Sequence, residues 1–360
     1  MRTYVVGGAV RDALLGRPVS DHDHVVVGAT PEQMVAQGFR PVGKDFPVFL
    51  HPDTQEEYAL ARTERKTAPG YHGFVFHTSP EVTLEEDLVR RDLTINAMAR
   101  AEDGSIVDPY GGREDLRDRI FRHVSSAFAE DPVRILRLAR FAARFPDFRV
   151  HASTLDLMRR MVASGEVDAL VPERVWQELA RGLMEERPSR MFAVLGDCGA
   201  LARILPELNA DASLMRMLDG AAAQGAPLEL RYAVLLHRLA QPDVLAVSKR
   251  LKVPNECRDL AQLTRRELDV VQRAGELDAE AIVTLFERSD AFRKPERFAQ
   301  MLMAAACIAD GARSPPSRLP RALAAGRAVN AGEVAARCAD KAAIPRAVHA
   351  ARVEAVAAEL

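Results

Sequence analysis

The spacing of apolar and polar positions changes near residue 125 and divides the chain into two kinds of pattern. In the first part, short apolar runs rich in Val are bounded by Gly, Pro and Asp, which is typical of strands. Between the first two runs, Gly7-Gly8 opens a segment, Gly8–Leu15, that predicts a helix. We expect strands at Tyr4–Val6, Val25–Val27, Val48–Leu50, Tyr58–Ala61 and Ile106–Val107.

From about residue 128 onward, apolar residues recur at spacings of three and four, which predicts helices at Val133–Phe145, Thr154–Val162 and Arg174–Glu185. Thr67–Phe76 (TAPGYHGFVF) predicts a loop or a long hairpin. Ser314–Pro320 (SPPSRLP) predicts a linker before an Ala-rich helical tail. The pattern favours an α+β protein with a small mixed α/β head followed by helices, because a Rossmann chain or barrel would alternate strands and helices to its end.

Composition narrows the class of protein. The 360 residues are 48% hydrophobic and 28% charged, with a formal net charge of −2, so any surface for nucleic acid must be local. The four cysteines form no C-x-x-C pair, which argues against a zinc ribbon or redox pair. The longest apolar runs are too short to span a bilayer, and the N-terminal residues do not resemble a signal peptide. We therefore expect a cytoplasmic protein without a membrane partner.

Two features of the head indicate phosphate and metal chemistry. Gly7-Gly8 lies between a predicted strand and a helix carrying Arg11, and such a turn lets free N–H groups approach a phosphate. Asp21 and Asp23 are separated by one residue, just before the valine strand. If the strand begins there, both carboxylates face the same side of the sheet. They repel each other unless a cation lies between them, and Mg²⁺ suits such a site. Each feature alone also fits an ordinary turn.

Two further segments carry polar groups at regular spacing. In Arg90–Ala99 (RRDLTINAMA), Asp92 and Asn96 are four residues apart and are expected on one helical face, with a plain helix start as the alternative. Further along, arginines follow Asp131 along one face of a predicted helix that is otherwise apolar. Such a stripe fits either an anion-binding cleft or an ordinary solvated face. These arginines are Arg134, Arg137, Arg140 and Arg144.

In this order, the segments resemble the signature of the polymerase-beta-like nucleotidyltransferases, in the bacterial group of CCA-adding tRNA nucleotidyltransferases and poly(A) polymerases. The resemblance is dense over residues 1–205 and patchy beyond. It implies that Asp21 and Asp23 hold catalytic Mg²⁺ and that Gly8 and Arg11 contact the incoming triphosphate. Glu56 and Glu57 are both candidates for a third carboxylate.

The resemblance also assigns the nucleotide contacts. It implies that Arg91 and Asp92 bind the sugar and phosphates, that Asp131 and Arg134 read the base, and that later arginines bind the triphosphate; these are Arg137 and Arg140. The chemistry is consistent, because cytosine and adenine both present an amine donor beside a ring-nitrogen acceptor, which a carboxylate and a guanidinium match. Uracil and guanine present the reverse pattern.

The resemblance implies four parts: a catalytic head (1–126), a helical neck (127–205), a helical body (206–313) and a helical tail (314–360). Longer relatives carry a phosphohydrolase site built on a His-Asp doublet, but here the doublet reads His237-Arg238, so we expect a shortened body without that site. Its expected role is to hold the acceptor and T arms of tRNA. Four basic residues fit either a patch for this contact or a plain solvated face: Lys249, Arg250, Lys252 and Arg258.

The expected activity is template-independent addition and repair of the 3′-terminal CCA of tRNA from CTP and ATP, with no DNA partner. Poly(A) polymerases share the motifs but usually carry paired basic residues where this chain has Lys44-Asp45. An enzyme adding only CC or only A, and an inactive RNA-binding protein, are further alternatives. The Pro172-Glu173-Arg174 segment is interpreted as a helix start with a structural role.

Overall fold

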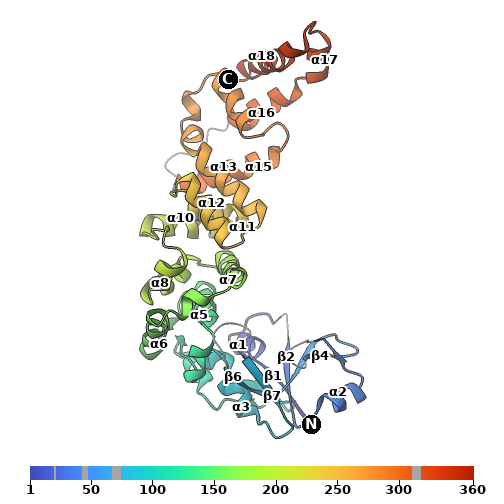
Figure 1. Cartoon of the computed structure of the whole chain (residues 1–360), viewed down its shortest axis with the longest axis vertical. Coiled ribbons are helices and arrows are strands. Elements are labelled where there is room, and N and C mark those ends of the chain that lie inside the picture. Colours follow the sequence, from blue (N-terminus) through green and yellow to red (C-terminus); the bar gives the residue numbers. More distant parts are fainter. Residues whose placement is uncertain (20–21, 43–47, 67–73, 310–317) are drawn as a thin grey trace. The chain divides into compact units, whose positions relative to one another are not determined.

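The computed structural model describes residues 1–19, 22–42, 48–66, 74–309 and 318–360 (Figure 1). Asp21, the Lys44-Asp45 pair and most of the Thr67–Phe76 loop lie outside the described residues. The chain forms two compact units. Unit 1 comprises Met1–Leu179 and Arg190–Ile204, and unit 2 comprises Ala180–Ser189 and Leu205–Leu360. The four-part division from the sequence stays a prediction.

The described strands of the head form a seven-stranded sheet in the order β3-β4-β5-β2-β1-β8-β9 (Figure 1). β2 and β5 run parallel, whereas β1 is antiparallel to both β2 and β8. The five predicted strands are confirmed to within two residues at each end. The strands are β1 (Arg2–Val6), β2 (Asp23–Val27), β3 (Arg40–Pro41), β4 (Val48–Leu50), β5 (Glu57–Leu60), β8 (Ala99–Arg100) and β9 (Ile106–Val107).

Alternating side chains give this sheet two apolar faces. Val25 and Val27 pack on one face with Leu88 of α3 (Leu84–Val89), and Val26 packs on the other with Met34 of α2 (Pro31–Ala36). Successive residues of β2 point to opposite faces of the sheet. The Asp23 side chain therefore lies on the same face as Val25 and Val27. A separate antiparallel pair, β6 (Arg62–Lys66) and β7 (Phe74–Thr78), flanks the Thr67–Phe76 segment and agrees with the hairpin alternative.

Helices complete unit 1, and the three predicted neck helices are confirmed. Most of α5 is buried, including Arg134 and Arg140, so these two arginines do not belong to a solvated face. The short parallel pair β10 (Ile120–Phe121) and β11 (Arg149–Val150) was not predicted. The helices are α1 (Gly8–Leu14), α4 (Gly112–Arg117), α5 (Val133–Arg144), α6 (Ala152–Ala163), α7 (Pro172–Met184), α8 (Ser189–Asp197) and α9 (Ala200–Ile204). The last residues of α7 and the first residue of α8 are assigned to unit 2.

The helical face predicted for Asp92 and Asn96 is wrong. Leu93 has extended backbone angles and bridges to His123, and the Thr94 N–H donates to the Arg122 carbonyl, so the chain cannot begin an α-helix there. Only a short 3₁₀ turn, η1 (Thr94–Asn96), follows. The Asn96 amide still donates to the Asp92 carboxylate at 3.0 Å, so the two side chains meet as predicted although the element differs.

Among its described residues, unit 2 contains helices joined by loops and no strands, and α11 lies within its apolar core. Beyond α11, His237 is buried and its Nδ1 lies 2.7 Å from the Val234 carbonyl, while Arg238 forms an ion pair with Asp211. No described helix is long and apolar enough to cross a membrane. The helices are α10 (Ala212–Ala223), α11 (Leu228–Leu236), α12 (Gln241–Arg250), α13 (Asn255–Gln272), α14 (Ala279–Arg288), α15 (Pro295–Ile308), α16 (Arg318–Ala328), α17 (Ala331–Ala336) and α18 (Ile344–Ala357).

Candidate active site

The Gly7-Gly8 turn lies at the carboxyl end of β1, where the chain enters α1. Gly7 has φ +69°, a conformation that residues with a Cβ rarely adopt. A Cβ there would also lie 3.0 Å from Nη1 of Arg91, and a Cβ on Gly8 would lie 3.5 Å from Nη2 of Arg11. Both guanidinium groups therefore lie against the turn, and the glycines leave the space that an anion would need.

The Arg91 guanidinium is anchored by a carboxylate and keeps one N–H donor, at Nε, without a hydrogen-bond partner among the described residues. Its Nη2 donates to the buried Asp87 carboxylate at 3.3 Å, and Arg90 donates to the same carboxylate at 2.7 Å. Burial raises the pKa of Asp87, but the Arg90 and Arg91 charges outweigh it and hold the pKa below its usual value. Among the described residues, Arg91 Nε is buried without a hydrogen-bond partner. A buried orphan donor beside a glycine turn fits a phosphate ligand.

The strand register separates the two glutamates that the sequence left as alternatives. Asp23 pairs with Val6 on β1 and with Glu57 on the parallel strand β5. Paired residues on neighbouring strands share a face, so the carboxylates of Asp23 and Glu57 lie on the same side of the sheet, next to the Gly7 turn. Among the described residues, the ion pairs at this end of the strands are formed by Glu56 and not by Asp23 or Glu57. Glu57 is therefore the candidate third carboxylate.

Glu56 belongs to the other side of the sheet. Its carboxylate lies 3.3 Å from His22 Nδ1 and 3.2 Å from His24 Nε2, and the His24 ring stacks on Tyr58 with centroids 4.1 Å apart. Burial lowers the pKa of His24, which suits a packed, neutral imidazole. The two histidines therefore lie on the face away from Asp23, and His24 is packed against Tyr58.

Asp92 is fully bonded inside the protein. Its Oδ1 accepts from the Leu93 N–H at 2.8 Å and from Asn96 Nδ2 at 3.0 Å, and its Oδ2 accepts from Nε and Nη2 of Arg137 at 3.0 and 2.9 Å. Burial raises its pKa, but the Arg137 charge outweighs this effect and keeps the carboxyl ionised. A ribose hydroxyl that donates to Asp92, as predicted, would have to share a carboxylate oxygen with these protein donors.

The arginines of α5 meet acidic partners or carbonyls in unit 1. Arg134 is buried and donates to the Ala127 carbonyl at 2.9 Å, and Arg140 donates to the buried Glu178 of α7 at 2.6 Å. Arg137 binds Asp92, yet its side chain remains 37% exposed and can still reach a ligand. Glu178 was missed in the sequence because it lies on a different helix, with no local signal.

Asp131, the predicted base-reading carboxylate, lies just before α5. Its Oδ1 accepts from the Val133 N–H at 3.1 Å, and both oxygens accept from Arg174 at 3.2 and 2.9 Å. Arg174 is on α7, so its position after Pro172 does mark a helix start, but its side chain also orients Asp131. A bidentate hydrogen bond of this kind fixes the plane of the carboxylate.

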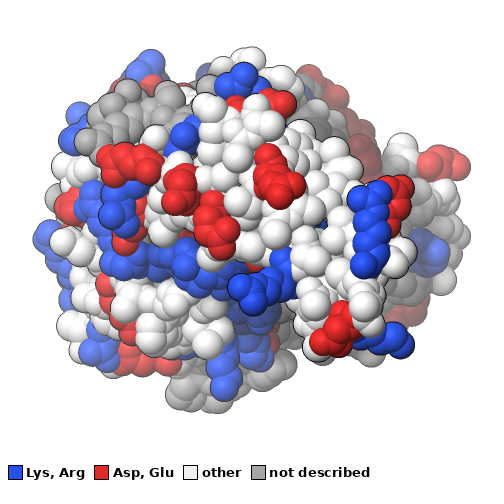
Figure 2. Space-filling view, turned by 90° about the horizontal axis from the view of Figure 1, so that it is seen from above, with Lys and Arg blue, Asp and Glu red and all other residues white. Residues whose placement is uncertain are grey.

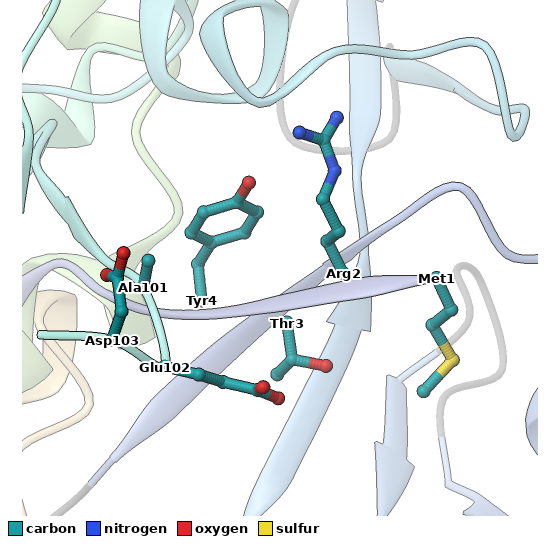
Figure 3. Close-up of a pocket in the computed structure, with 7 residues that line it drawn as sticks. All are labelled: Met1, Arg2, Thr3, Tyr4, Ala101, Glu102 and Asp103. Atoms are coloured by element: carbon teal, nitrogen blue, oxygen red, sulfur yellow. The ribbon is translucent and has the colours of Figure 1, made fainter. Parts of the chain in front are cut away.

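A pocket elsewhere in the head is separate from these residues. It lies at the start of β1, at the opposite end of the strand from Gly7, where Arg2 and Tyr4 project from the same side (Figure 3). Its remaining lining residues are Met1, Thr3, Ala101, Glu102 and Asp103. None of the predicted site residues lines this pocket.

The sequence matches two families. Residues 3–122 match the family described as the Poly A polymerase head domain, and residues 147–211 match the probable RNA and SrmB-binding site of polymerase A. A relative from Janthinobacterium sp. (strain Marseille), named multifunctional CCA protein, is 61% identical over 407 aligned residues, which cover 100% of this chain and 98% of the relative. This alignment is longer than the 360 residues here, so the relative contains segments that this chain lacks.

Solved structures give a similar result. A CCA-adding enzyme from Bacillus stearothermophilus, in complex with CTP, is 28% identical with a TM-score of 0.73, over 99% of this chain and 89% of that one. A Thermotoga maritima CCA-adding enzyme complexed with tRNA has a TM-score of 0.71 over 99% of this chain and 87% of that one. At 21% identity, the second likeness shows the fold alone.

Proposed function

We propose that this chain, which belongs to the family of the multifunctional CCA proteins, adds the 3′-terminal CCA sequence to tRNA from CTP and ATP. The RNA 3′-hydroxyl attacks the α-phosphate of the nucleotide, and pyrophosphate leaves. One observation supports this proposal most directly. The same compact unit contains the Asp23–Glu57 carboxylate pair, beside the glycine turn, and the two residues proposed to recognise the base, Asp131 and Arg134. The bacterial cytoplasm, where tRNA is made, is the proposed location.

Carboxylates of the head would hold the metal. Nucleotidyltransferases of this kind generally use a divalent metal ion, and we propose Mg²⁺, bound by Asp21, Asp23 and Glu57. The donor set fits, because carboxylates that share a face and lack a cationic partner among the described residues would otherwise repel each other. When bound, the metal lowers the pKa of the attacking hydroxyl and stabilises the leaving oxygen. Arg91 and the Gly8 turn hold the triphosphate.

Base choice rests on the start of α5. Asp131 accepts from the exocyclic amine of cytosine or adenine, and Arg134 donates to the adjacent ring nitrogen. Because Arg174 already fixes the Asp131 carboxylate, the acceptor is in place before the nucleotide arrives. A base with the reverse pattern leaves buried polar groups unpaired, which costs about 1–3 kcal/mol for each group. Arg137 and Arg140 are assigned to the phosphates.

The helical unit 2 is proposed to hold the tRNA. Figure 2 shows a row of Lys and Arg side chains on one face of the molecule, with Asp and Glu side chains beside it, and basic side chains are the groups that contact nucleic-acid phosphates. Part of the patch predicted on α12 and α13 is already neutralised, because Arg250 donates to Glu207 at 2.6 and 2.8 Å and Arg258 donates to Asp259. Lys249 and Lys252 remain exposed. The shortened body without a phosphohydrolase site also stays a proposal.

An incorporation assay tests the function. Protein, Mg²⁺ and a tRNA lacking its last three nucleotides are incubated with each labelled NTP, and the products are resolved at single-nucleotide length. We expect two additions with CTP alone and a third when ATP is also present. A long ladder with ATP alone would instead make the protein a poly(A) polymerase, and additions that stop at CC would make it a CC-adding enzyme.

The Asp23→Asn variant provides the matched inactive protein. It keeps the size of the side chain but removes a metal-binding charge, so transfer should fall at least about 100-fold. Binding of the tRNA, measured by filter retention, should change little because unit 2 is untouched. Full transfer by this variant would refute the metal assignment.

A further inference from the structure

The head and the neck helix α5 are joined by a closed circuit of polar side chains in unit 1. Beginning at α5, Arg137 donates to Asp92, and Asn96 donates to the other oxygen of Asp92. Asn96 Oδ1 then accepts from Arg11 Nη1 at 2.6 Å, and Arg11 Nε donates to Asp12 at 2.8 Å. We call this circuit the head–neck ring; its members are Arg137, Asp92, Asn96, Arg11, Asp12 and Arg144.

The ring closes on the same helix from which it starts. Arg144 Nη2 donates to Asp12 at 2.9 Å, and Arg144 lies seven residues after Arg137, two turns along one face of α5. Phe141 of α5 and Phe145, the residue that follows the helix, each place their ring centroid 5.1 Å from the Arg11 guanidinium. Because the links run through side chains in fixed rotamers, α5 cannot slide along α1 without breaking several bonds together.

The ring touches both halves of the proposed chemistry. On the head side, Arg11 Nη2 faces the Gly8 turn, which would hold the triphosphate. On the neck side, Arg137 is one turn after Arg134, which would read the base. Arg11, Asp12, Asp92 and Asn96 are all buried, so a missing partner inside the ring is not replaced by water.

We propose that the head–neck ring sets the distance between the base reader at the start of α5 and the phosphate-binding turn, and that Asn96 is its essential neutral link. Asn96 accepts on one side and donates on the other, which a carboxylate at this position cannot do. On this view Asp92 and Arg11 are positioning residues, and Asp92 acts on base choice by fixing the position of α5 through its bonds to Arg137. The inference deepens the proposed function and rests on it.

The Asn96→Asp variant keeps the shape but faces the Asp92 carboxylate with a second one. We expect the ratio of kcat/KM for CTP to that for UTP to fall about tenfold or more, because a displaced reader no longer distinguishes the two bases. The Asp115→Asn variant is the control, since Asp115 is buried beside the ring and accepts from Thr94 at 2.7 Å but has no link to α5. Its ratio should match that of the unaltered protein.

The double variant Asp92→Asn, Asn96→Asp restores the donor and acceptor order around the ring, but it loses the bond from the Leu93 N–H and gives Arg137 a neutral amide oxygen in place of the carboxylate. It should bring the CTP-to-UTP ratio back to within about threefold of the unaltered protein. An unchanged ratio in Asn96→Asp, a loss of equal size in Asp115→Asn, or no recovery in the double variant would each overturn the proposal.

A measurement independent of activity separates the ring from the proposed function. Asp12 and Arg137 do not bond to each other, yet they belong to one circuit. In urea unfolding, the effects of Asp12→Asn and Arg137→Gln on the unfolding equilibrium constant should combine non-additively by at least about threefold. Additive effects would mean that the six residues do not act as a unit, whatever reaction the protein catalyses.

Discussion

At the scale of single residues, the direction of one carboxylate depends on a side chain from another helix. Asp131 receives two bonds from Arg174 and one from the Val133 N–H, so its free acceptor position is fixed. Arginine is suited to this role because its planar fork matches both oxygens, whereas a lysine makes a single, rotatable contact. The choice between bases therefore depends on α7 as well as on α5.

Replacing Arg174 by Lys should reduce base choice without unfolding the protein. We expect the CTP-to-UTP ratio of kcat/KM to fall about tenfold, the equivalent of about 1.4 kcal/mol, while kcat for CTP changes less. Arg181→Lys, an exposed position on the same helix, is the control. If misincorporation of UMP by the Arg174 variant equals that of the control, Arg174 does not orient the base reader.

At the scale of elements, α5 and α7 are held together by a buried ion pair. Arg140 and Glu178 are both buried, and the guanidinium Nε donates to the carboxylate at 2.6 Å. The Arg140 guanidinium also lies over the Phe141 ring, 4.6 Å from its centroid. A buried pair of this kind adds little net stability compared with apolar side chains, but breaking it leaves a charge without a partner.

The Glu178→Leu variant should destabilise the protein by about 3–5 kcal/mol, because it removes the carboxylate that is paired with the buried Arg140 guanidinium. Adding Arg140→Met should recover most of this loss, since two apolar groups then meet. Chemical denaturation followed by circular dichroism measures both changes. A single variant as stable as the unaltered protein would show that Arg140 escapes to solvent.

The periodic elements could be predicted from the sequence, and the long-range contacts could not. Helices such as α5 and strands such as β2 show their spacing locally. In contrast, Glu56 and Glu57 differ only in which side of the sheet they face, and that is set by the pairing of β5 with β2. The turn at Thr94–Asn96 was mistaken for a helix because the bond to Arg122, which prevents one, joins segments far apart in the sequence.

At the scale of the whole molecule, a histidine ties the last helix to the rest of unit 2. His349 of α18 lies between Glu287 and Glu280 of α14, with ring nitrogens 2.9 and 2.8 Å from the carboxylates. Arg352 also pairs with Glu287. The hydrogen bonds that the His349 ring donates to Glu287 and Glu280 raise its pKa above the usual value. The tail is therefore held more strongly when this imidazole is charged.

A raised pKa in the folded state means that the contribution is fully present below the ordinary histidine pKa and is lost as the pH rises through the folded value. His349→Gln should lower the calorimetric unfolding temperature by about 1–3 °C near pH 6, with little difference near pH 9. A difference of the same size at both pH values would exclude protonation as its origin.

The path of the chain between its two units restricts how the protein can be dissected. The polypeptide leaves unit 1 after Leu179, returns at Arg190 and leaves again after Ile204. A recombinant fragment that stops at Leu179 would lack α8 and α9, and the apolar surface that normally covers Met191 and Phe192 would face water. Truncation for expression, or proteolysis aimed at releasing the catalytic half, should therefore yield a soluble product only when the cut follows Ile204.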